Sequence, residues 1–148
     1  MMFAADIVML TNYGYDSFFP QRNEEYPIFG EKVFAPMDGE VVKVENTIPD
    51  NTPYAGSYPY NAGNIVVIKK GSLYLLLGHL HDKSIVVKQG DKVKTNDLIA
   101  HTGNSGMSER PHIHMQLMES SLGNYWKGAG VSISFEGANV FKNRVIIK

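Results

Sequence analysis

The chain has 148 residues, of which 43% are hydrophobic and 20% charged, so it can enclose one core and is too apolar to be disordered. Its 14 basic and 15 acidic residues give a formal net charge of −1, so we do not expect a general nucleic-acid binder. It contains no cysteine, which excludes disulfides, thiolate metal sites and thiol nucleophiles. Any metal must be held by His, Asp or Glu, which suits zinc or a similar ion.

The N-terminal residues carry no export signal. Residues 1–6 lack a basic segment, and Asp6 interrupts their short apolar run. No apolar run approaches the roughly 18 residues that span a bilayer, so no transmembrane segment is expected. The sequence therefore indicates either a cytosolic protein or an export signal that lies outside this chain.

Short apolar runs separated by turn residues predict a succession of strands. In chain order these strands are expected at 33–36, 41–44, 64–69, 72–77, 85–88, 92–94, 98–100, 111–118 and 145–147.

Two of these runs, 64–69 and 72–77, are almost continuously apolar, which is typical of strands buried on both faces. Residues 48–63 hold several prolines, asparagines and aspartates and predict a long loop. The segment Gly103–Gly106 predicts a flexible corner. No segment has a sustained helical period with caps at both ends. The sequence therefore predicts a single-domain, all-β protein.

Two of the five histidines, His112 and His114, are separated by one residue on a predicted strand. Residues two apart on a strand point to the same face, so these two imidazoles are expected to project side by side. They can share a metal, or one can bind it while the other serves as acid or base. The same pattern also fits a polar pair on a solvated face.

The other histidines are less distinctive. His79 follows a very apolar strand, where a histidine is commonly buried and hydrogen-bonded. A functional role would require this strand end to reach His112 and His114, which periodicity does not show. We interpret His81 and His101 as surface residues.

Six segments, in their order and spacing, resemble the lysostaphin-type (LytM-like) zinc endopeptidases of bacterial cell-wall turnover. The resemblance runs from about Phe3 to Met118. It implies one peptidase domain over residues 1–148, with an antiparallel β-sheet or barrel-sandwich fold of the duplicated hybrid motif type and a substrate groove. The segments are Val33–Val42, Gly63–Ile68, Gly78–Leu80, Val87–Lys94, Gly103–Gly106 and Pro111–His114.

The resemblance also implies roles for three histidines. His114 matches a zinc ligand, and His112 and His79 match two catalytic imidazoles. In that family zinc polarises the scissile carbonyl and lowers the pKa of a water, while a histidine accepts the proton and the imidazoles stabilise the oxyanion. The implied substrates are peptide stems or cross-bridges of peptidoglycan, and the implied location is extracytoplasmic.

The family's remaining ligands, a histidine and an aspartate commonly spaced HxxxD, have no full match here, because no histidine precedes His79. Asp16 fits the carboxylate position if Asn12 replaces the histidine. Asp6 fits a branch of the family in which the neighbouring residues agree over a longer stretch, and we favour it. The missing histidine would then lie at or before Met1, in a domain cut short at its N-terminus.

Two alternatives to a zinc endopeptidase remain. The absent histidine is consistent with a non-catalytic binding or scaffold module that has an incomplete metal site. Residues 87–100 also resemble the turn-rich repeats of lipoyl carriers and of sugar-phosphotransferase IIA domains. A carrier needs a lysine at a hairpin tip, usually beside a methionine, and no Met-Lys pair occurs in the chain.

Overall fold

The computed structural model describes residues 4–9, 20–55, 62–121, 123–124, 127–135 and 138–139, and strands dominate them. Their one helical element is a 3-10 turn, η1 (Asn23–Glu25), and none of their helices is long and apolar enough to span a membrane. The strands are β1 (Ala4–Ile7), β2 (Lys32–Phe34), β3 (Gly39–Glu45), β4 (Asn64–Lys70), β5 (Leu73–Leu80), β6 (Lys92–Val93), β7 (Leu98–His101), β8 (Ile113–Glu119), β9 (Ala129–Gly130), β10 (Ser134–Phe135) and β11 (Ala138–Asn139).

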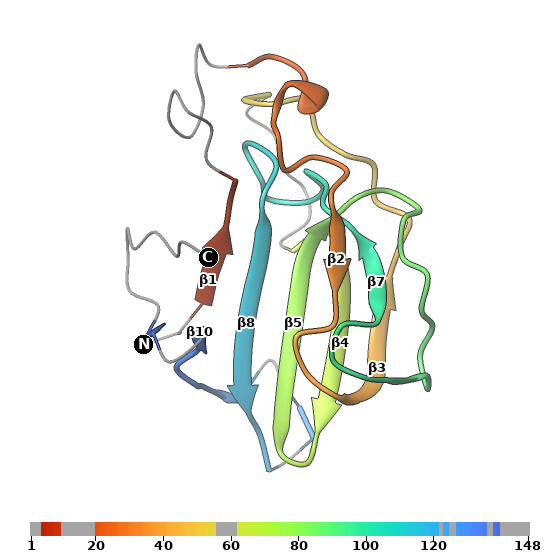
Figure 1. Cartoon of the computed structure of the whole chain (residues 1–148), viewed down its shortest axis with the longest axis vertical. Helices are drawn as coiled ribbons and strands as arrows, with labels where there is room; N and C mark the ends of the chain where they lie inside the picture. Colours follow the sequence, from red (N-terminus) through yellow and green to blue (C-terminus); the bar gives the residue numbers. More distant parts are fainter. Residues whose placement is uncertain are drawn as a thin grey trace.

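Seven of the described strands form one antiparallel sheet (Figure 1). Its order is β1-β8-β5-β4-β3-β6, and β9 pairs with β8 outside this path. β1 lies beside β8, although the two strands are far apart in the sequence. β2 and β7 form a second, two-stranded layer, which lies in front of β3 and β4 in Figure 1. This architecture confirms the predicted all-β, antiparallel fold.

The main core lies between the large sheet and the β2–β7 layer, and the other face of the large sheet carries a smaller cluster. Successive residues of β4 and β5 alternate between the two, so these strands are buried on both faces, as predicted. Each fully buried aliphatic side chain contributes about 1.5–3 kcal/mol relative to exposure. The main core includes Val33, Val41, Val66, Ile68, Leu75, Leu77, Leu80, Ile99, Ile113 and Met115, and the smaller cluster comprises Ile65, Val67, Tyr74, Leu76 and Met118.

Two expectations about local structure were wrong. The run at 85–88 does not form a strand, although the N–H of Val86 donates to Ile99 O at 2.9 Å. Gly103–Gly106 is not a flexible corner, because Asn104 and Ser105 are fully buried and hydrogen-bonded to the 48–64 region. The expected strand at 145–147 lies outside the described residues. The described parts of 48–63 form a loop, as predicted.

Candidate active site

His112 and His114 face the side of the sheet opposite the β2–β7 layer. Along β8, the side chains of Ile113 and Met115 enter the main core. Because side chains alternate along a strand, the histidines on either side of Ile113 point the other way. Strand alternation had predicted that these two imidazoles share a face.

The strand register places a carboxylate beside them. His114 is paired with Gly78 of β5 on one side and with Asp6 of β1 on the other. Oδ1 of Asp6 lies 2.9 Å from Nδ1 of His114 and 3.7 Å from Nε2 of His112. Asp6 is therefore held in the sheet by β1 and meets both histidines.

His79 reaches the same face through a β-bulge. Leu75 and Leu77 enter the main core, so regular alternation would send His79 there too. A register shift against β4 falls at this point, His79 takes a left-handed backbone with φ of 57°, and Leu80 occupies the core instead. The His79 ring centre then lies 4.6 Å from that of His112. Bulges commonly re-aim side chains in this way next to active sites.

The protonation state of His79 follows from its contacts. Nδ1 of His79 lies 2.8 Å from the carbonyl oxygen of Ser105. Because a carbonyl can only accept, Nδ1 carries the hydrogen and Nε2 of the neutral ring keeps its lone pair. Burial first, and then the neighbouring His112, lower the pKa of His79 to about 4. The ring is therefore neutral near pH 7, with Nε2 as a proton acceptor.

His112 is held in the same way. Its Nδ1 donates to the carbonyl oxygen of Arg110 at 2.9 Å, and Oγ of Ser108 lies 3.2 Å from the same nitrogen. Burial lowers the pKa of His112. Nε2 of His112 is the atom that faces Asp6. In both imidazoles a backbone carbonyl thus binds Nδ1, which leaves Nε2 as the unprotonated nitrogen of the neutral ring.

Asp6 and His114 shift one another's pKa in opposite directions. The hydrogen bond to Asp6 raises the pKa of His114, and the hydrogen bond from His114 lowers the pKa of Asp6. The Asp6 side chain is 62% exposed, whereas that of His114 is 26% exposed. This pair forms the open side of the site.

Asp6 and His114 fit a zinc ion in part. A carboxylate oxygen and an imidazole nitrogen are donor types that zinc prefers. Two donors of a tetrahedral zinc lie roughly 3.4 Å apart, given bond lengths near 2.1 Å, so the observed separation of 2.9 Å would have to widen by about 0.5 Å. Catalytic zinc sites usually take three protein ligands. Within the described ranges, no group of three His, Cys, Asp or Glu residues could hold a metal.

Asn12 and Asp16 fall outside the described residues. His81 and His101, interpreted from the sequence as surface residues, are partly exposed, and Nδ1 of His81 bonds to the carboxylate of Asp50.

Sequence reasoning missed the groups that orient the imidazoles. The acceptors for His79 and His112 are backbone carbonyls, of Ser105 and Arg110, which leave no mark in a residue pattern. The one available signal is the Gly103–Gly106 segment, whose composition wrongly predicts a flexible corner.

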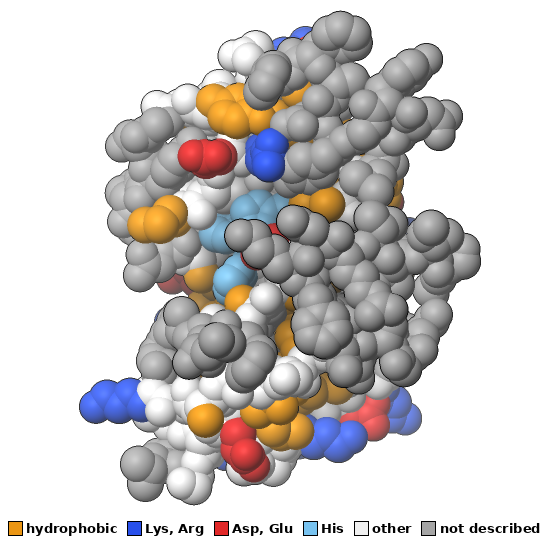
Figure 2. Space-filling view, turned by 90° about the vertical axis from the view of Figure 1, so that its left-hand side faces the viewer, with side chains coloured by type: hydrophobic (Ala, Val, Ile, Leu, Met, Phe, Trp, Pro, Cys, Tyr) orange, Lys and Arg blue, Asp and Glu red, His pale blue; other side chains and the backbone are white. Residues whose placement is uncertain are grey.

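Figure 2, which views the molecule from the side on which β1 and β8 lie in Figure 1, shows histidine side chains gathered in a hollow near the middle, with a basic and several hydrophobic side chains around it. Exposure differs among the site's side chains: that of Asp6 is 62% exposed, that of His114 26% and that of His112 15%.

Residues 25–128 match Peptidase family M23. Among curated proteins, peptidoglycan DD-endopeptidase ShyA of Vibrio cholerae is 37% identical over 89 residues, which cover 60% of this chain and 18% of that protein. Glycyl-glycine endopeptidase ALE-1 of Staphylococcus capitis is 30% identical over 95 residues, covering 64% of this chain and 23% of that protein. The chain thus spans less than a quarter of either relative's length.

Solved structures show the same fold. A mutant of the catalytic domain of the prophage-encoded M23 protein EnpA from Enterococcus faecalis superposes with a TM-score of 0.55 at 23% identity, covering 88% of this chain and 87% of that chain. Lysostaphin from Staphylococcus simulans gives a TM-score of 0.51 at 24% identity, covering 69% and 38%. Since the family match extends over most of the sequence, the chain belongs to peptidase family M23.

Proposed function

We propose that this chain is the peptidase domain of a zinc-dependent endopeptidase that cleaves peptide stems or cross-bridges of bacterial peptidoglycan. The observation that carries the proposal is the convergence of Asp6, His79, His112 and His114 from three strands onto one open face. Membership of peptidase family M23 and the activities named for ShyA and ALE-1 support the substrate class. The proposed location is extracytoplasmic, where peptidoglycan lies.

The four side chains divide into two pairs. Asp6 and His114 would hold the zinc. The chemistry that bound zinc supplies is Lewis acidity toward a carbonyl oxygen and a water molecule. His79 and His112 handle protons: the Nε2 of one ring would accept one proton from the attacking water and later return it to the leaving amine, and in between the protonated ring would donate a hydrogen bond to the developing oxyanion. The carbonyls of Ser105 and Arg110 keep both rings oriented for this task.

The test is to measure zinc content and hydrolysis together on the purified chain. We expect about one zinc per chain and release of peptides from purified peptidoglycan, with loss of both on treatment with a strong chelator and recovery on adding zinc. A chain that takes up zinc but releases no peptide, or that takes up none at micromolar concentrations, contradicts the proposal.

A second candidate function is a non-catalytic module that binds peptidoglycan or a protein. The observation that favours it is the pair of donors, Asp6 and His114, where a catalytic zinc site usually has three. A sedimentation assay with purified peptidoglycan distinguishes the endopeptidase from the binding module. Co-sedimentation without zinc and without cleavage supports the binding module.

A further inference from the structure

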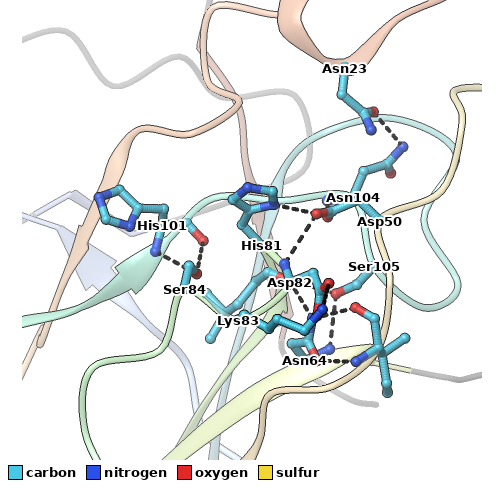
Figure 3. A network of polar contacts seen from close by, with 12 residues as sticks. Asn23, Asp50, Asn64, His81, Asp82, Lys83, Ser84, His101, Asn104 and Ser105 are labelled. Atoms are coloured by element: carbon cyan, nitrogen blue, oxygen red, sulfur yellow. Dashed lines mark hydrogen bonds and ion pairs between the residues drawn. The ribbon is translucent and has the colours of Figure 1, made fainter.

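One buried carboxylate joins two segments that come from different parts of the chain. Asp50 lies in the loop between β3 and β4, and its side chain is 10% exposed. Its Oδ1 accepts from the N–H of Asn104 at 2.5 Å, and its Oδ2 accepts from the N–H of Asp82 at 3.1 Å and bonds to Nδ1 of His81 (Figure 3). The carboxylate thereby links the chain just after β5 to the segment that follows β7.

These two segments are the ones that hold His79. The N–H of Gly103 donates to His79 O at 3.1 Å, and Ser105 O accepts from Nδ1 of the ring. In the sequence, Asn104 lies between Gly103 and Ser105, which make these two contacts, and its N–H donates to Asp50. Asp50 therefore anchors the segment two peptide groups before the Ser105 carbonyl, on which the tautomer of His79 depends.

The next residue, Asn51, holds the continuation of the same segment toward His112. Its Nδ2 donates to Gly106 O at 2.6 Å and to Ser108 O at 3.2 Å, and its N–H donates to Asn104 O at 3.0 Å. Ser108 in turn places its Oγ beside Nδ1 of His112. Asp50 and Asn51 thus contact the segment beneath both imidazoles without touching either ring in the described contacts.

We propose that Asp50 and Asn51 are positioning residues that hold His79 and His112 with Nδ1 protonated and Nε2 directed into the site. The tautomer of a histidine is set by the hydrogen bond that its other nitrogen makes, so a fixed Ser105 carbonyl fixes the reactive nitrogen of His79. The effect on catalysis rests on the proposed endopeptidase function, whereas the effect on the tautomer does not.

The decisive variant is Asp50→Asn. Its amide would replace one acceptor oxygen with an NH₂ donor that meets another donor, either the N–H of Asn104 or those of Asp82 and His81. The matched control is Asp97→Asn, because Asp97 also accepts a backbone N–H, from Lys94 at 2.8 Å, but in an exposed turn before β7.

The first readout is the side-chain ¹⁵N spectrum of the histidines in the purified, folded chain. In the parent chain and in Asp97→Asn we expect the shifts of His79 to show a protonated Nδ1 and an unprotonated Nε2. In Asp50→Asn the two shifts should approach each other, as in a mixture of tautomers. Unchanged nitrogen shifts for His79 in a folded Asp50→Asn chain would overturn the proposal.

The second readout is the hydrolysis of a soluble peptidoglycan peptide. Asp50→Asn should lower kcat about 10- to 100-fold and leave KM within about twofold, the size of effect seen when outer-shell partners are removed. If the parent chain hydrolyses nothing, the endopeptidase proposal fails, and the nitrogen spectrum still decides the tautomer. If Asp50→Asn does not fold by circular dichroism, Asn51→Asp takes its place with the same readouts. Loss of the fold in both variants would assign these residues a structural role and overturn the proposal.

Discussion

The two sides of the histidine site are built differently. On the imidazole side, His79 is 5% exposed, and both rings donate to backbone carbonyls that distant parts of the chain hold in place. On the carboxylate side, Asp6 comes from the short edge strand β1, and its side chain is 62% exposed. Folding alone therefore fixes the two imidazoles that we propose as proton carriers, whereas the side that we propose to bind metal is open and incomplete among the described residues. If these roles are right, proton transfer and metal binding can be lost separately.

The largest expected effect that distinguishes the role of the imidazole side from that of the carboxylate side comes from removing one imidazole. His79→Ala should lower kcat by about 10²- to 10⁴-fold, because a positioned acid or base contributes that much, and it should leave the zinc content unchanged. Peptide release and metal analysis on the same sample measure both. His112→Ala should behave alike, and the double variant should lose little more than either single one, because groups acting as a unit are not additive.

The matched change on the other side is His114→Ala. It should lower zinc affinity by more than about 100-fold, since even an outer-shell partner of a ligand commonly accounts for 10- to 100-fold. Calorimetric zinc titration measures this. Equal loss of zinc in His79→Ala and His114→Ala would show that the division into catalysts and ligands is wrong.

The rigidity of the imidazole side can be tested at Gly103. A Cβ there would lie within 2.4 Å of Oδ1 of Asp50 and of the backbone of His81, so Gly103→Ala should cost about 3 kcal/mol in the free energy of unfolding. Gly71→Ala is the control: its Cβ would meet nothing within 4 Å, and its positive φ alone should cost about 1 kcal/mol. Urea unfolding compares them, and equal costs would contradict the tight packing of this side.

The smallest expected effect is on the carboxylate side. Asp6→Ala should change the free energy of unfolding of the metal-free chain by no more than about 0.5 kcal/mol, because exposed ion pairs are screened by water. The same variant should lose zinc binding. Urea unfolding in the presence of a chelator provides the measurement, and a loss above about 2 kcal/mol would mean that β1 is as firmly fixed as the imidazole side.

The sequence predicts a feature of the fold or of the site when the residues that cause this feature lie close together in the chain. The shared face of His112 and His114 follows from alternation within one strand, and the buried pair β4 and β5 follows from two continuous apolar runs. The convergence of His79 on that face depends on a bulge defined by its register against β4, which no local pattern contains. The segment Gly103–Gly106 is held by hydrogen bonds from Asp50 and Asn51, which are distant in the sequence. Its glycine-rich composition alone therefore wrongly predicted a flexible corner.

The left-handed backbone at His79 determines which substitutions evolution would favour at that position. A residue with a Cβ is strained at φ of 57° by about 1–2 kcal/mol, although histidine, asparagine and aspartate tolerate this conformation better than most, and glycine adopts it without strain. Substitution by glycine would therefore relieve backbone strain and remove the imidazole. A lineage that no longer needed the ring would be expected to drift toward glycine, and this chain carries a histidine there.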